Sequence, residues 1–244
     1  MIVVVPMAGR GSRFADHGVQ TPKPLIEVRG RPMVAWALDG LGDVLAAARR
    51  VVFVALREHD ERFGLRTLLP SLTGPRTDVV SLDAVTDGQL RTVLAAEALF
   101  RPDDDVLVAS CDTYVAPGIA RDVAARRPDC HGIISVVRAP GDRWSFARTD
   151  ETGRVVEVAE KRRISDLAST GLYYFSRADE LVEVARGMFA RGETTRGEYY
   201  VIPVYERYIA RGWRVDVSEA PGMHDMGTPD ALRAFLAAGA RPDR

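Results

Sequence analysis

Short continuous runs of apolar, mostly β-branched residues recur along the chain, separated by more polar stretches. Such runs, which do not alternate between apolar and polar positions, are typical of strands that are buried on both faces of a sheet. They predict strands at Ile2–Val5, Val51–Ala55, Val79–Leu82, Val106–Ala109 and Ile133–Val137.

Between most of these runs, apolar residues recur with the spacing of an amphipathic helix. This spacing predicts helices over Met33–Leu45, Leu90–Leu99 and Ile119–Arg126. Strands that alternate with helices form a mainly parallel sheet with helices on both faces. The predicted fold class is therefore α/β, with a Rossmann-like, mainly parallel sheet flanked by helices.

The pattern changes after about residue 140. A turn-like Asp150–Gly153 lies between extended segments within Arg148–Glu160, and a strand-like Gly171–Phe175 follows. These segments predict an added β ribbon. Two further segments predict helix starts. Ser176–Asp179 matches a capping box, and Thr228–Asp230 has a capping residue, a proline and an acidic residue in the order typical of a helix start.

The chain has 244 residues, of which 46% are hydrophobic, enough to bury a substantial core. It contains no internal repeat, low-complexity tract or long Pro/Gly/Ser linker. We therefore expect residues 1–240 to form one domain, with a frayed tail at Gly239–Arg244.

The 33 basic and 34 acidic residues are mixed along the chain, and the formal net charge is -1. A nucleic-acid or acidic-membrane partner would call for a concentrated basic surface, so neither is expected. Met1–Val5 leads straight into a strand without the features of a secretory signal, and no apolar run has transmembrane length. Cys111 and Cys130 have neither a metal-binding spacing nor a disulfide framework. We expect a soluble, cytoplasmic protein.

Lysine occurs at only two positions, Lys23 and Lys161, whereas the other 31 basic residues are arginines. An ammonium group is a compact point charge, and a guanidinium group is a broad planar fork. This contrast favours the hypothesis that each lysine lies in a tight phosphate pocket. The alternative is that the two lysines have no special role and merely remain in an arginine-rich composition.

A glycine-rich segment, Pro6–Phe14, follows the first predicted strand. Gly9 and Gly11 allow a sharp turn that brings backbone N–H groups close to a ligand, and Arg13 can close on phosphate oxygens. The segment is not a Walker A sequence, and Phe14 stands where the Rossmann fingerprint has its third glycine. A plain strand-to-helix turn is the alternative.

A second segment, Thr21–Ile26, holds Lys23 between two prolines. The prolines restrict the backbone, which reduces the freedom lost when Lys23 is ordered against an anion. The alternative is a rigid surface turn that carries a solvated charge.

Together these two segments resemble the sugar-phosphate nucleotidyltransferase family, whose members join a nucleoside triphosphate to a sugar 1-phosphate and release pyrophosphate. The resemblance continues in order through nearly the whole chain, at Thr86–Gln89, Ser110–Asp112, Glu160-Lys161, Ser169–Gly171 and Asp225–Thr228. Longer members carry a hexapeptide-repeat β-helix after this domain, and we expect no such extension here. Members of the family are commonly dimers or tetramers, so a homo-oligomer is one expectation.

The resemblance implies a role for each matching position. Mg²⁺ would be held by Asp112 and Asp225, and the incoming phosphate by Lys161. The base would pack on Gly88 and Gln89. Sugar hydroxyls would meet Glu160, Thr170 and Gly171, and the triphosphate would meet Lys23 and the loop residues Met7, Ala8, Gly9, Gly11, Ser12 and Arg13.

Structural alternatives exist for several of these residues. Asp112 could instead be a carboxylate at the end of a strand that caps a turn. Asp225 could be an acidic residue that stabilises the start of a helix. Glu160 could pair with Arg162 or Arg163 instead of a sugar. Cys111 is expected to be a packed thiol beside the site, because nothing near it in sequence would activate it.

The chain departs from the family where the acceptor would bind, since Arg143–Ala147 replaces the usual Tyr-Gly pair and Met223 replaces an aromatic residue. Three other functions stay open: a nucleotidyltransferase for a non-sugar phosphate or phosphonate, a nucleotide sensor without turnover, and a dinucleotide-dependent oxidoreductase. The oxidoreductase hypothesis rests only on Gly9 and Gly11. Glu27 is a poor match for the acidic residue that binds the ribose in dinucleotide-dependent oxidoreductases. The sequence does not choose among the nucleoside triphosphates.

Overall fold

The computed structural model describes residues 1–238. The expected frayed tail, Gly239–Arg244, lies outside these residues, as do the last two residues of the expected domain. The strands of the main sheet are β1 (Ile2–Pro6), β4 (Arg50–Leu56), β5 (Thr77–Leu82), β6 (Val106–Ala109), β8 (Cys130–Arg138), β9 (Ser145–Thr149), β10 (Val155–Glu160), β11 (Leu167–Phe175) and β12 (Arg214–Glu219).

The described helices differ widely in length, from one turn to about four. They are α1 (Ser12–Ala15), α2 (Met33–Asp39), α3 (Asp43–Ala47), α4 (Arg57–Phe63), α5 (Leu65–Thr73), α6 (Gln89–Leu94), α7 (Ile119–Ala124), α8 (Ala178–Arg191), α9 (Pro203–Ala210) and α10 (Pro229–Ala237), with 3-10 turns at Lys23–Leu25 and Glu97–Leu99. Two small ribbons pair β2 (Glu27–Val28) with β3 (Arg31–Pro32), and β7 (Thr113–Val115) with β13 (Met223–Asp225).

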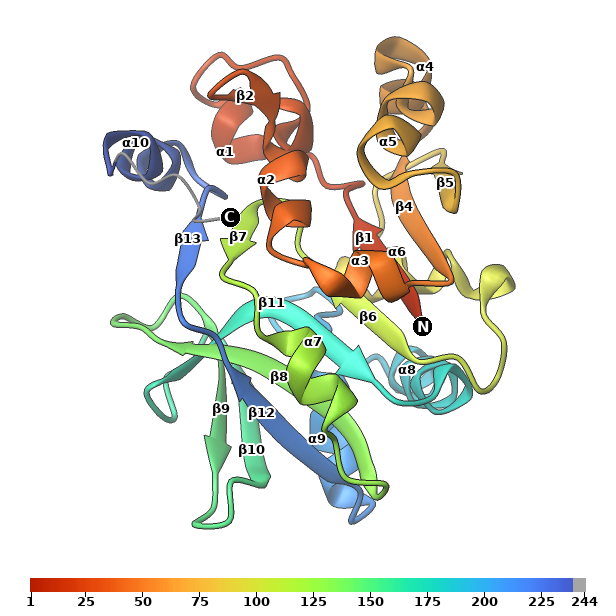
Figure 1. Ribbon diagram of the computed structural model, residues 1–244, viewed down its shortest axis with the longest axis vertical. Coiled ribbons are helices and arrows are strands. Elements are labelled where there is room, and N and C mark those ends of the chain that lie inside the picture. Colours follow the sequence, from red (N-terminus) through yellow and green to blue (C-terminus); the bar gives the residue numbers. More distant parts are fainter. Residues whose placement is uncertain (239–244) are drawn as a thin grey trace.

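The main sheet runs in the order β10-β9-β11-β6-β1-β4-β5; off this path, β8 pairs with β11, and β12 pairs with β8 (Figure 1). In its first half β1 is parallel to β4 and β6, and β4 is parallel to β5. In the second half β11 is antiparallel to β6, β8 and β9. The α/β prediction is confirmed, and so is the added ribbon, which is the β9–β10 pair at the lower left of Figure 1.

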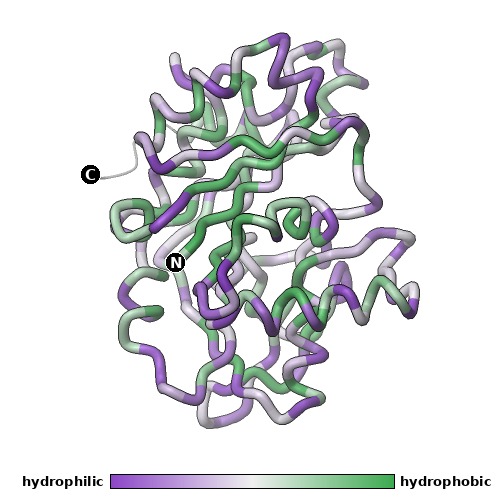
Figure 2. The backbone as a smooth tube through the Cα atoms, turned by 90° about the vertical axis from the view of Figure 1, so that its right-hand side faces the viewer, coloured by the Kyte–Doolittle hydropathy of each residue, from purple (hydrophilic) through white to green (hydrophobic). Residues whose placement is uncertain are grey.

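Both faces of the sheet are buried, as the continuous apolar runs predict. On β1, Ile2 and Val4 belong to the core cluster that includes residues of α6, α8 and α9, whereas Val3 and Val5 belong to the cluster that includes residues of α2, α3, α5 and α7. The hydrophobic central strands are visible along the middle of the molecule in Figure 2. All five predicted strands are present.

Some predicted helices are shorter or divided. The segment Met33–Leu45 breaks into α2 and α3 around Gly40, where a Cβ atom would lie 2.3 Å from the carbonyl oxygen of Val115, so only glycine allows this approach of α2 to β7. The segment Leu90–Leu99 ends its α-helix at Leu94 and continues as a 3-10 turn.

A helix begins at each of the two predicted helix starts, but only one of the two has the predicted cap. Thr228 caps α10, and its Oγ1 accepts a hydrogen bond from the N–H of Ala231 at 3.1 Å. The capping box at Ser176–Asp179 does not form, because Arg177 is the N-cap of α8 and its guanidinium pairs with Asp179.

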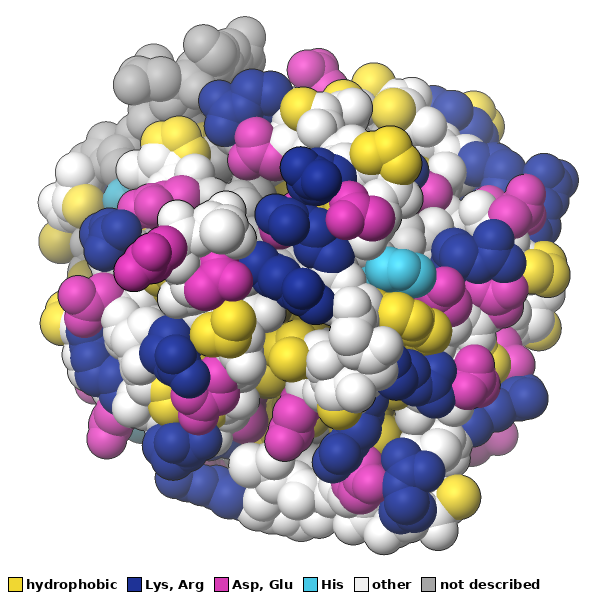
Figure 3. All heavy atoms as spheres, turned by 90° about the horizontal axis from the view of Figure 1, so that it is seen from below, with side chains coloured by type: hydrophobic (Ala, Val, Ile, Leu, Met, Phe, Trp, Pro, Cys, Tyr) yellow, Lys and Arg dark blue, Asp and Glu magenta, His cyan; other side chains and the backbone are white. Residues whose placement is uncertain are grey.

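No helix within residues 1–238 is long and apolar enough to cross a membrane. On the face shown in Figure 3, basic and acidic side chains alternate rather than forming a basic stripe. This mixture agrees with the charge pattern of the sequence.

Candidate active site

The glycine-rich loop, Thr86–Gln89 and Ser110–Asp112 follow the carboxyl ends of β1, β5 and β6, respectively. The chain leaves β1 towards β4 on one side, while β6 is added on the other side of β1. In open α/β sheets, ligands bind at such a switch point. Two adjoining cavities open there.

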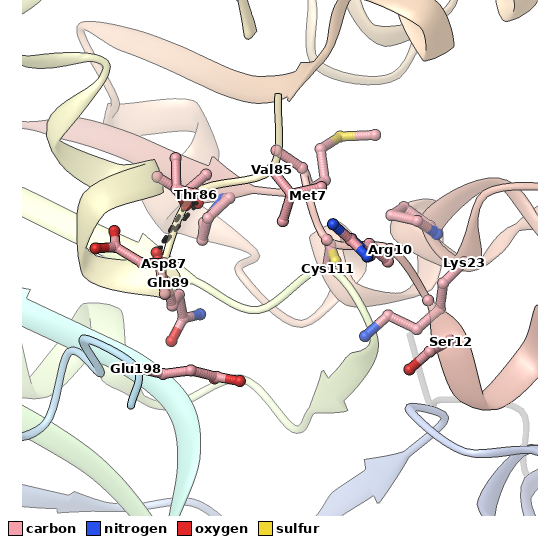
Figure 4. A pocket seen from close by; sticks show the side chains of 17 residues that line it. Met7, Arg10, Ser12, Lys23, Val85, Thr86, Asp87, Gln89, Cys111 and Glu198 are labelled. Carbon is pink, nitrogen blue, oxygen red and sulfur yellow. Dashed lines mark hydrogen bonds between the residues drawn. The ribbon is translucent and has the colours of Figure 1, made fainter. Parts of the chain in front are cut away.

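The first cavity has a volume of about 710 Å³. Arg10 and Lys23 lie on one side of it, and Gln89 and Glu198 lie on the other (Figure 4). Its wall is formed by Pro6, Met7, Ala8, Gly9, Arg10, Gly11, Ser12, Lys23, Pro24, Val85, Thr86, Asp87, Gly88, Gln89, Thr92, Cys111 and Glu198.

The glycine-rich loop is anchored at both ends. The N–H of Met7 donates to the carbonyl oxygen of Val54 at 2.8 Å, and Phe14 is buried against Met33 and Trp36. Gly11 has φ +60°, a left-handed conformation that favours glycine. Phe14 therefore anchors the loop at the position where the Rossmann fingerprint has glycine.

Arg13 does not line the first cavity. Its exposed side chain lines the second cavity and an outer groove of about 620 Å³. Arg10, to which the sequence assigned no role of its own, is the arginine on the wall of the first cavity.

Gly88 is required by a close approach of two backbones. Its φ is +139°, and a Cβ atom would lie 2.4 Å from the backbone nitrogen of Tyr199. This contact is closed by hydrogen bonds from the N–H of Tyr199 to Asp87 and from the N–H of Leu90 to Tyr199, each 2.9 Å long. Gln89 begins α6 and lines both cavities.

Lys23 joins the two cavities. Its Nζ donates to Oδ2 of Asp112 at 2.6 Å, and the lysine lines both walls. Burial is the largest single influence on the pKa of Lys23 and would lower it, but the charge of Asp112, its hydrogen bond to Lys23 and the other nearby acidic groups together raise the pKa. Burial would likewise raise the pKa of Asp112, but Lys23 lowers it. Both groups are therefore charged at neutral pH, and Lys23 is not a solvated surface charge.

Asp112 and Asp225 converge although 113 positions in sequence separate them. The β7–β13 ribbon pairs Asp225 with Thr113, and the N–H of Met226 donates to the carbonyl oxygen of Asp112 at 2.8 Å. A Cβ atom on Gly227 would lie 2.7 Å from Oδ2 of Asp112 and 3.0 Å from Oδ1 of Asp225. The two carboxylates thus form a cradle that the missing side chain of Gly227 leaves open.

This pair of oxygens fits a hard divalent cation such as Mg²⁺, which is held in proteins by one or two carboxylates together with substrate phosphates. Within the described residues no group of three or more His, Cys, Asp or Glu side chains could hold a metal. Asp225 does not cap α10, since Thr228 does so, and its Oδ1 instead accepts a 2.8 Å hydrogen bond from the N–H of Gly227.

The second cavity, of about 410 Å³, lies on the far side of Lys23 and Gln89. Carboxylates, hydroxyl groups and aromatic rings share its wall. It is lined by Arg13, Lys23, Gln89, Ser110, Asp112, Thr113, Arg143, Trp144, Ser145, Glu160, Ser169, Thr170, Gly171, Tyr173, Tyr200, Asp225, Gly227 and Thr228.

Glu160 faces this cavity and accepts a short hydrogen bond from Oγ of Ser145. Burial raises the pKa of Glu160 above its usual range, and the hydrogen bond from Ser145 opposes that rise. The surface alternative for Glu160 is wrong, because Arg162 pairs with Glu157 and Arg163 pairs with Asp166.

Thr170 and Gly171 line the second cavity. Oγ1 of Thr170 donates to the carbonyl oxygen of Ser135 at 3.4 Å. Gly171 has φ +87°, and a Cβ atom there would lie 2.1 Å from Oγ of Ser110. A side chain at position 171 would therefore collide with the side chain of Ser110, two residues before Asp112.

Lys161 is the predicted site residue that the structure does not bring to the cavity wall. Its φ is +51°, and its Nζ donates to the hydroxyl group of Tyr200 and lies 4.5 Å from the centre of that ring. Tyr200 does line the second cavity. The predicted direct contact of Lys161 with an incoming phosphate is not supported by this geometry.

Cys111 is buried on the wall of the first cavity, and burial raises its thiol pKa to about 12. The prediction of a packed, unreactive thiol is confirmed.

Comparison with known proteins identifies the family. The sequence profile described as the MobA-like NTP transferase domain matches residues 3–193. The chain belongs to this family. The MobA-like domain thus contains the glycine-rich loop, Lys23, Asp112 and Glu160, whereas Asp225 lies beyond the matched residues.

Some curated relatives of this MobA-like chain are named after different acceptors. It is 27% identical to the bifunctional protein GlmU of Thermotoga petrophila over 82% of this chain, but it spans only 43% of GlmU. It is 25% identical to the UTP–glucose-1-phosphate uridylyltransferase AglF of Haloferax volcanii, covering 94% of this chain and 93% of AglF. It is 29% identical to the 2-aminoethylphosphonate cytidylyltransferase of Lancefieldella rimae, covering 95% and 90%.

A solved structure, the nucleoside-diphosphate-sugar pyrophosphorylase of Vibrio cholerae, has the same fold as the MobA-like chain. The TM-score is 0.85 at 28% identity, over 96% of this chain and 99% of that one. The expected resemblance to sugar-phosphate nucleotidyltransferases is therefore confirmed at the level of family and fold.

Proposed function

We propose that this chain transfers a nucleoside monophosphate from a nucleoside triphosphate to a sugar 1-phosphate or a related cyclitol phosphate. An acceptor phosphate oxygen attacks the α-phosphorus, the bond from the α-phosphorus to the bridging oxygen breaks, and pyrophosphate leaves with the bonding electrons. The observation that carries the proposal is the carboxylate cradle of Asp112 and Asp225, which lines the second cavity beside Lys23, the residue that pairs with Asp112 and lines both cavities. A site for joining two phosphate-bearing ligands needs such a position.

The proposal assigns the nucleotide to the first cavity. The backbone N–H groups of the loop from Met7 to Ser12 and the guanidinium of Arg10 would meet the triphosphate, and Arg13 would close on it from the second cavity. Gly88 and Gln89 would pack against the base. Lys23, which reaches both cavities, would neutralise charge at the α-phosphate.

Asp112 and Asp225 would hold Mg²⁺, which when bound supplies charge neutralisation and orientation at the reacting phosphates. No general base is needed, because the second ionisation of a phosphate monoester lies near pH 6. The acceptor would occupy the second cavity, with Glu160 and the Thr170-Gly171 backbone at its hydroxyl groups. Lys161 would influence the acceptor site indirectly, through its hydrogen bond to Tyr200. The proposal includes two further points. Residues 1–240 would act as one catalytic domain, and the protein would work in the cytoplasm, where such substrates are made.

A second candidate acceptor is a phosphonate. It is favoured by the 2-aminoethylphosphonate cytidylyltransferase, whose similarity covers nearly the whole chain. A carboxylate such as Glu160 can accept hydrogen bonds from an amine as well as from hydroxyl groups.

The deciding experiment measures pyrophosphate release with Mg²⁺, the five common nucleoside triphosphates and a panel of acceptors. The panel holds hexose, heptose and cyclitol 1-phosphates together with 2-aminoethylphosphonate and phosphocholine. We expect release that depends on one acceptor class. Tight nucleotide binding without release from any pair would contradict the proposal and favour a nucleotide sensor.

Replacing Glu160 by glutamine should raise the acceptor KM by about 10-fold, because a charged hydrogen-bond acceptor is lost at an enclosed wall. The triphosphate KM should not change. Steady-state kinetics with each substrate varied in turn checks this, with Glu151→Gln, in the exposed turn between β9 and β10, as the control. An unchanged acceptor KM would show that Glu160 makes no acceptor contact.

The same variant should change how stability depends on pH. Because the pKa of Glu160 is raised above the ordinary 4.5, the native state holds this proton more tightly than the unfolded chain. The free energy of unfolding contributed by Glu160 therefore falls as the pH rises from 4.5 through the raised native pKa. Glutamine has no proton to lose, so the variant should gain stability relative to the wild type over that window. Chemical denaturation at several pH values checks this, and parallel pH profiles would contradict it.

A further inference from the structure

Strand β5 lies at one end of the main sheet, on the right of Figure 1. Within residues 1–238 its one strand neighbour is β4, to which it is parallel from Thr77 to Leu82 without a register shift. The other end of the sheet is less open, because an isolated bridge joins Arg154, just before β10, to Asp216 on β12. The sheet therefore has an open edge at β5.

The backbone of every second residue of β5 points away from β4. The N–H of Val51 donates to the carbonyl oxygen of Arg76 at 2.9 Å, and Val51 lies opposite Thr77. In a parallel ladder, this places the even-numbered residues of β5 in the hydrogen bonds to β4. The N–H and C=O groups of Thr77, Val79 and Ser81 therefore face outward from the sheet, as a row of donors and acceptors that another strand can use.

The usual protection of an edge strand is missing from β5. Proteins commonly block such an edge with a lysine, a proline or a bulge. From Thr77 to Leu82 the strand has no lysine or proline, and its register with β4 shows no bulge. Its one charged residue, Asp78, pairs with Arg50 of β4 at 2.9 Å. The edge is therefore suited to the addition of another strand.

The outward-facing residues of β5 are symmetric about Val79, because a hydroxyl residue stands on each side of it. When two copies meet antiparallel on a two-fold axis at Val79, each Val79 lies opposite the other, and Thr77 lies opposite Ser81. Each such pair exchanges two N–H···O bonds, and pairs of β-branched or hydroxyl residues stabilise antiparallel strands. Pro75, which has no N–H, falls opposite Asp83 and ends the ladder. The strand thus fits a second copy of itself, and a two-fold contact of this kind closes as a dimer.

We propose that this chain forms a homodimer in which β5 pairs antiparallel with β5 of a second copy, so that the two main sheets become one continuous sheet. The inference goes beyond the proposed function and does not depend on it. The interface lies close in sequence to the first cavity, because β5 leads into the Thr86–Gln89 segment on the wall of that cavity. Pairing at β5 would fix the strand from which this segment starts.

The first test is the mass of the protein in solution, measured by light scattering after size-exclusion chromatography at about 50 µM. We expect twice the 26.8 kDa of one chain. Val79→Pro should weaken dimerisation at least about 30-fold, because proline removes the outward N–H of both copies and takes no hydrogen bond from the ladder with β4. Val79→Thr keeps the N–H and a β-branched side chain, so it is the matched control and should stay dimeric.

Amide hydrogen exchange of the wild type is the second test, and it carries the inference if the proline variant fails to fold. The amides of Val79 and Ser81 should exchange slowly in concentrated protein and faster on dilution. The amide of Val80, which belongs to the ladder with β4, should be protected at both concentrations. A monomeric wild type would leave the edge to a different partner and overturn the inference. A dimer that Val79→Pro leaves intact, or in which Val79 and Ser81 exchange freely, would place the interface elsewhere and overturn it as well.

Discussion

Replacing Asp112 by asparagine should lower the rate of pyrophosphate release at least about 1,000-fold, which corresponds to about 4 kcal/mol of transition-state stabilisation. The substitution removes half of the carboxylate cradle and the charge that faces Lys23 at 2.6 Å. Asparagine keeps the size of the side chain and one oxygen that can accept a hydrogen bond from Lys23. The thermal unfolding midpoint should nevertheless fall, because the buried ammonium of Lys23 loses its counter-charge, while the protein stays folded at room temperature.

Two measurements check this prediction together with turnover. Mn²⁺ binding, followed by electron paramagnetic resonance, should weaken strongly in the Asp112→Asn variant, and the near-ultraviolet circular dichroism spectrum should be unchanged. Asp129→Asn is the control, because Asp129 is an exposed residue that pairs with Arg127 outside the two cavities. Undiminished turnover and Mn²⁺ binding in a folded Asp112→Asn protein would exclude the proposed metal role.

The sequence predicts the strands of the fold well because burial on both faces leaves a direct trace. Val3 and Val5 pack on one side of β1, and Ile2 and Val4 pack on the other, so all four positions must be apolar. The breaks within helices leave no such trace. The end of α2 depends on the distance from Gly40 to Val115, which is set by tertiary packing.

The candidate site was predictable only where a single local motif forms it. The loop around Gly11 turns as its glycines predict, and Lys23 lies between its two prolines as expected. The meeting of Asp112 with Asp225 depends on the pairing of β7 with β13, two three-residue strands that the apolar pattern did not reveal. Only the resemblance to a family linked these two acids before the structure did.

The acceptor side was predicted least well, and for a physical reason. The direction of Lys161 depends on a left-handed turn that arginine and lysine rarely adopt, so its sequence gives no warning. Tyr200 lies in the eleven-residue connection between α8 and α9, and the sequence analysis missed it entirely. Arg143 was noticed only as part of a departure from the family pattern, and its ion pair with Asp225 is visible only in three dimensions.

Gly227→Ala should lower turnover about 100-fold while leaving both carboxylates in the protein. Gly227 does not have a positive φ, so alanine introduces no backbone strain of that kind. The added methyl group would lie 2.7 Å from Oδ2 of Asp112 and 3.0 Å from Oδ1 of Asp225, which is too close for the present arrangement. The two oxygens must therefore move apart or rotate away from a shared ligand.

The readout that tests this reasoning is metal affinity. Mn²⁺ should bind Gly227→Ala about 10- to 100-fold more weakly than wild type, whereas metal-free binding of the nucleoside should be unchanged because the first cavity does not include Gly227. Gly222→Ala is a matched control, since no atom lies within 4 Å of the Cβ position there. Normal Mn²⁺ affinity in Gly227→Ala would mean that Asp112 and Asp225 do not share one ion. Weak affinity in Gly227→Ala together with normal affinity in Gly222→Ala would show that the spacing of the two oxygens, and not their charge alone, makes the site.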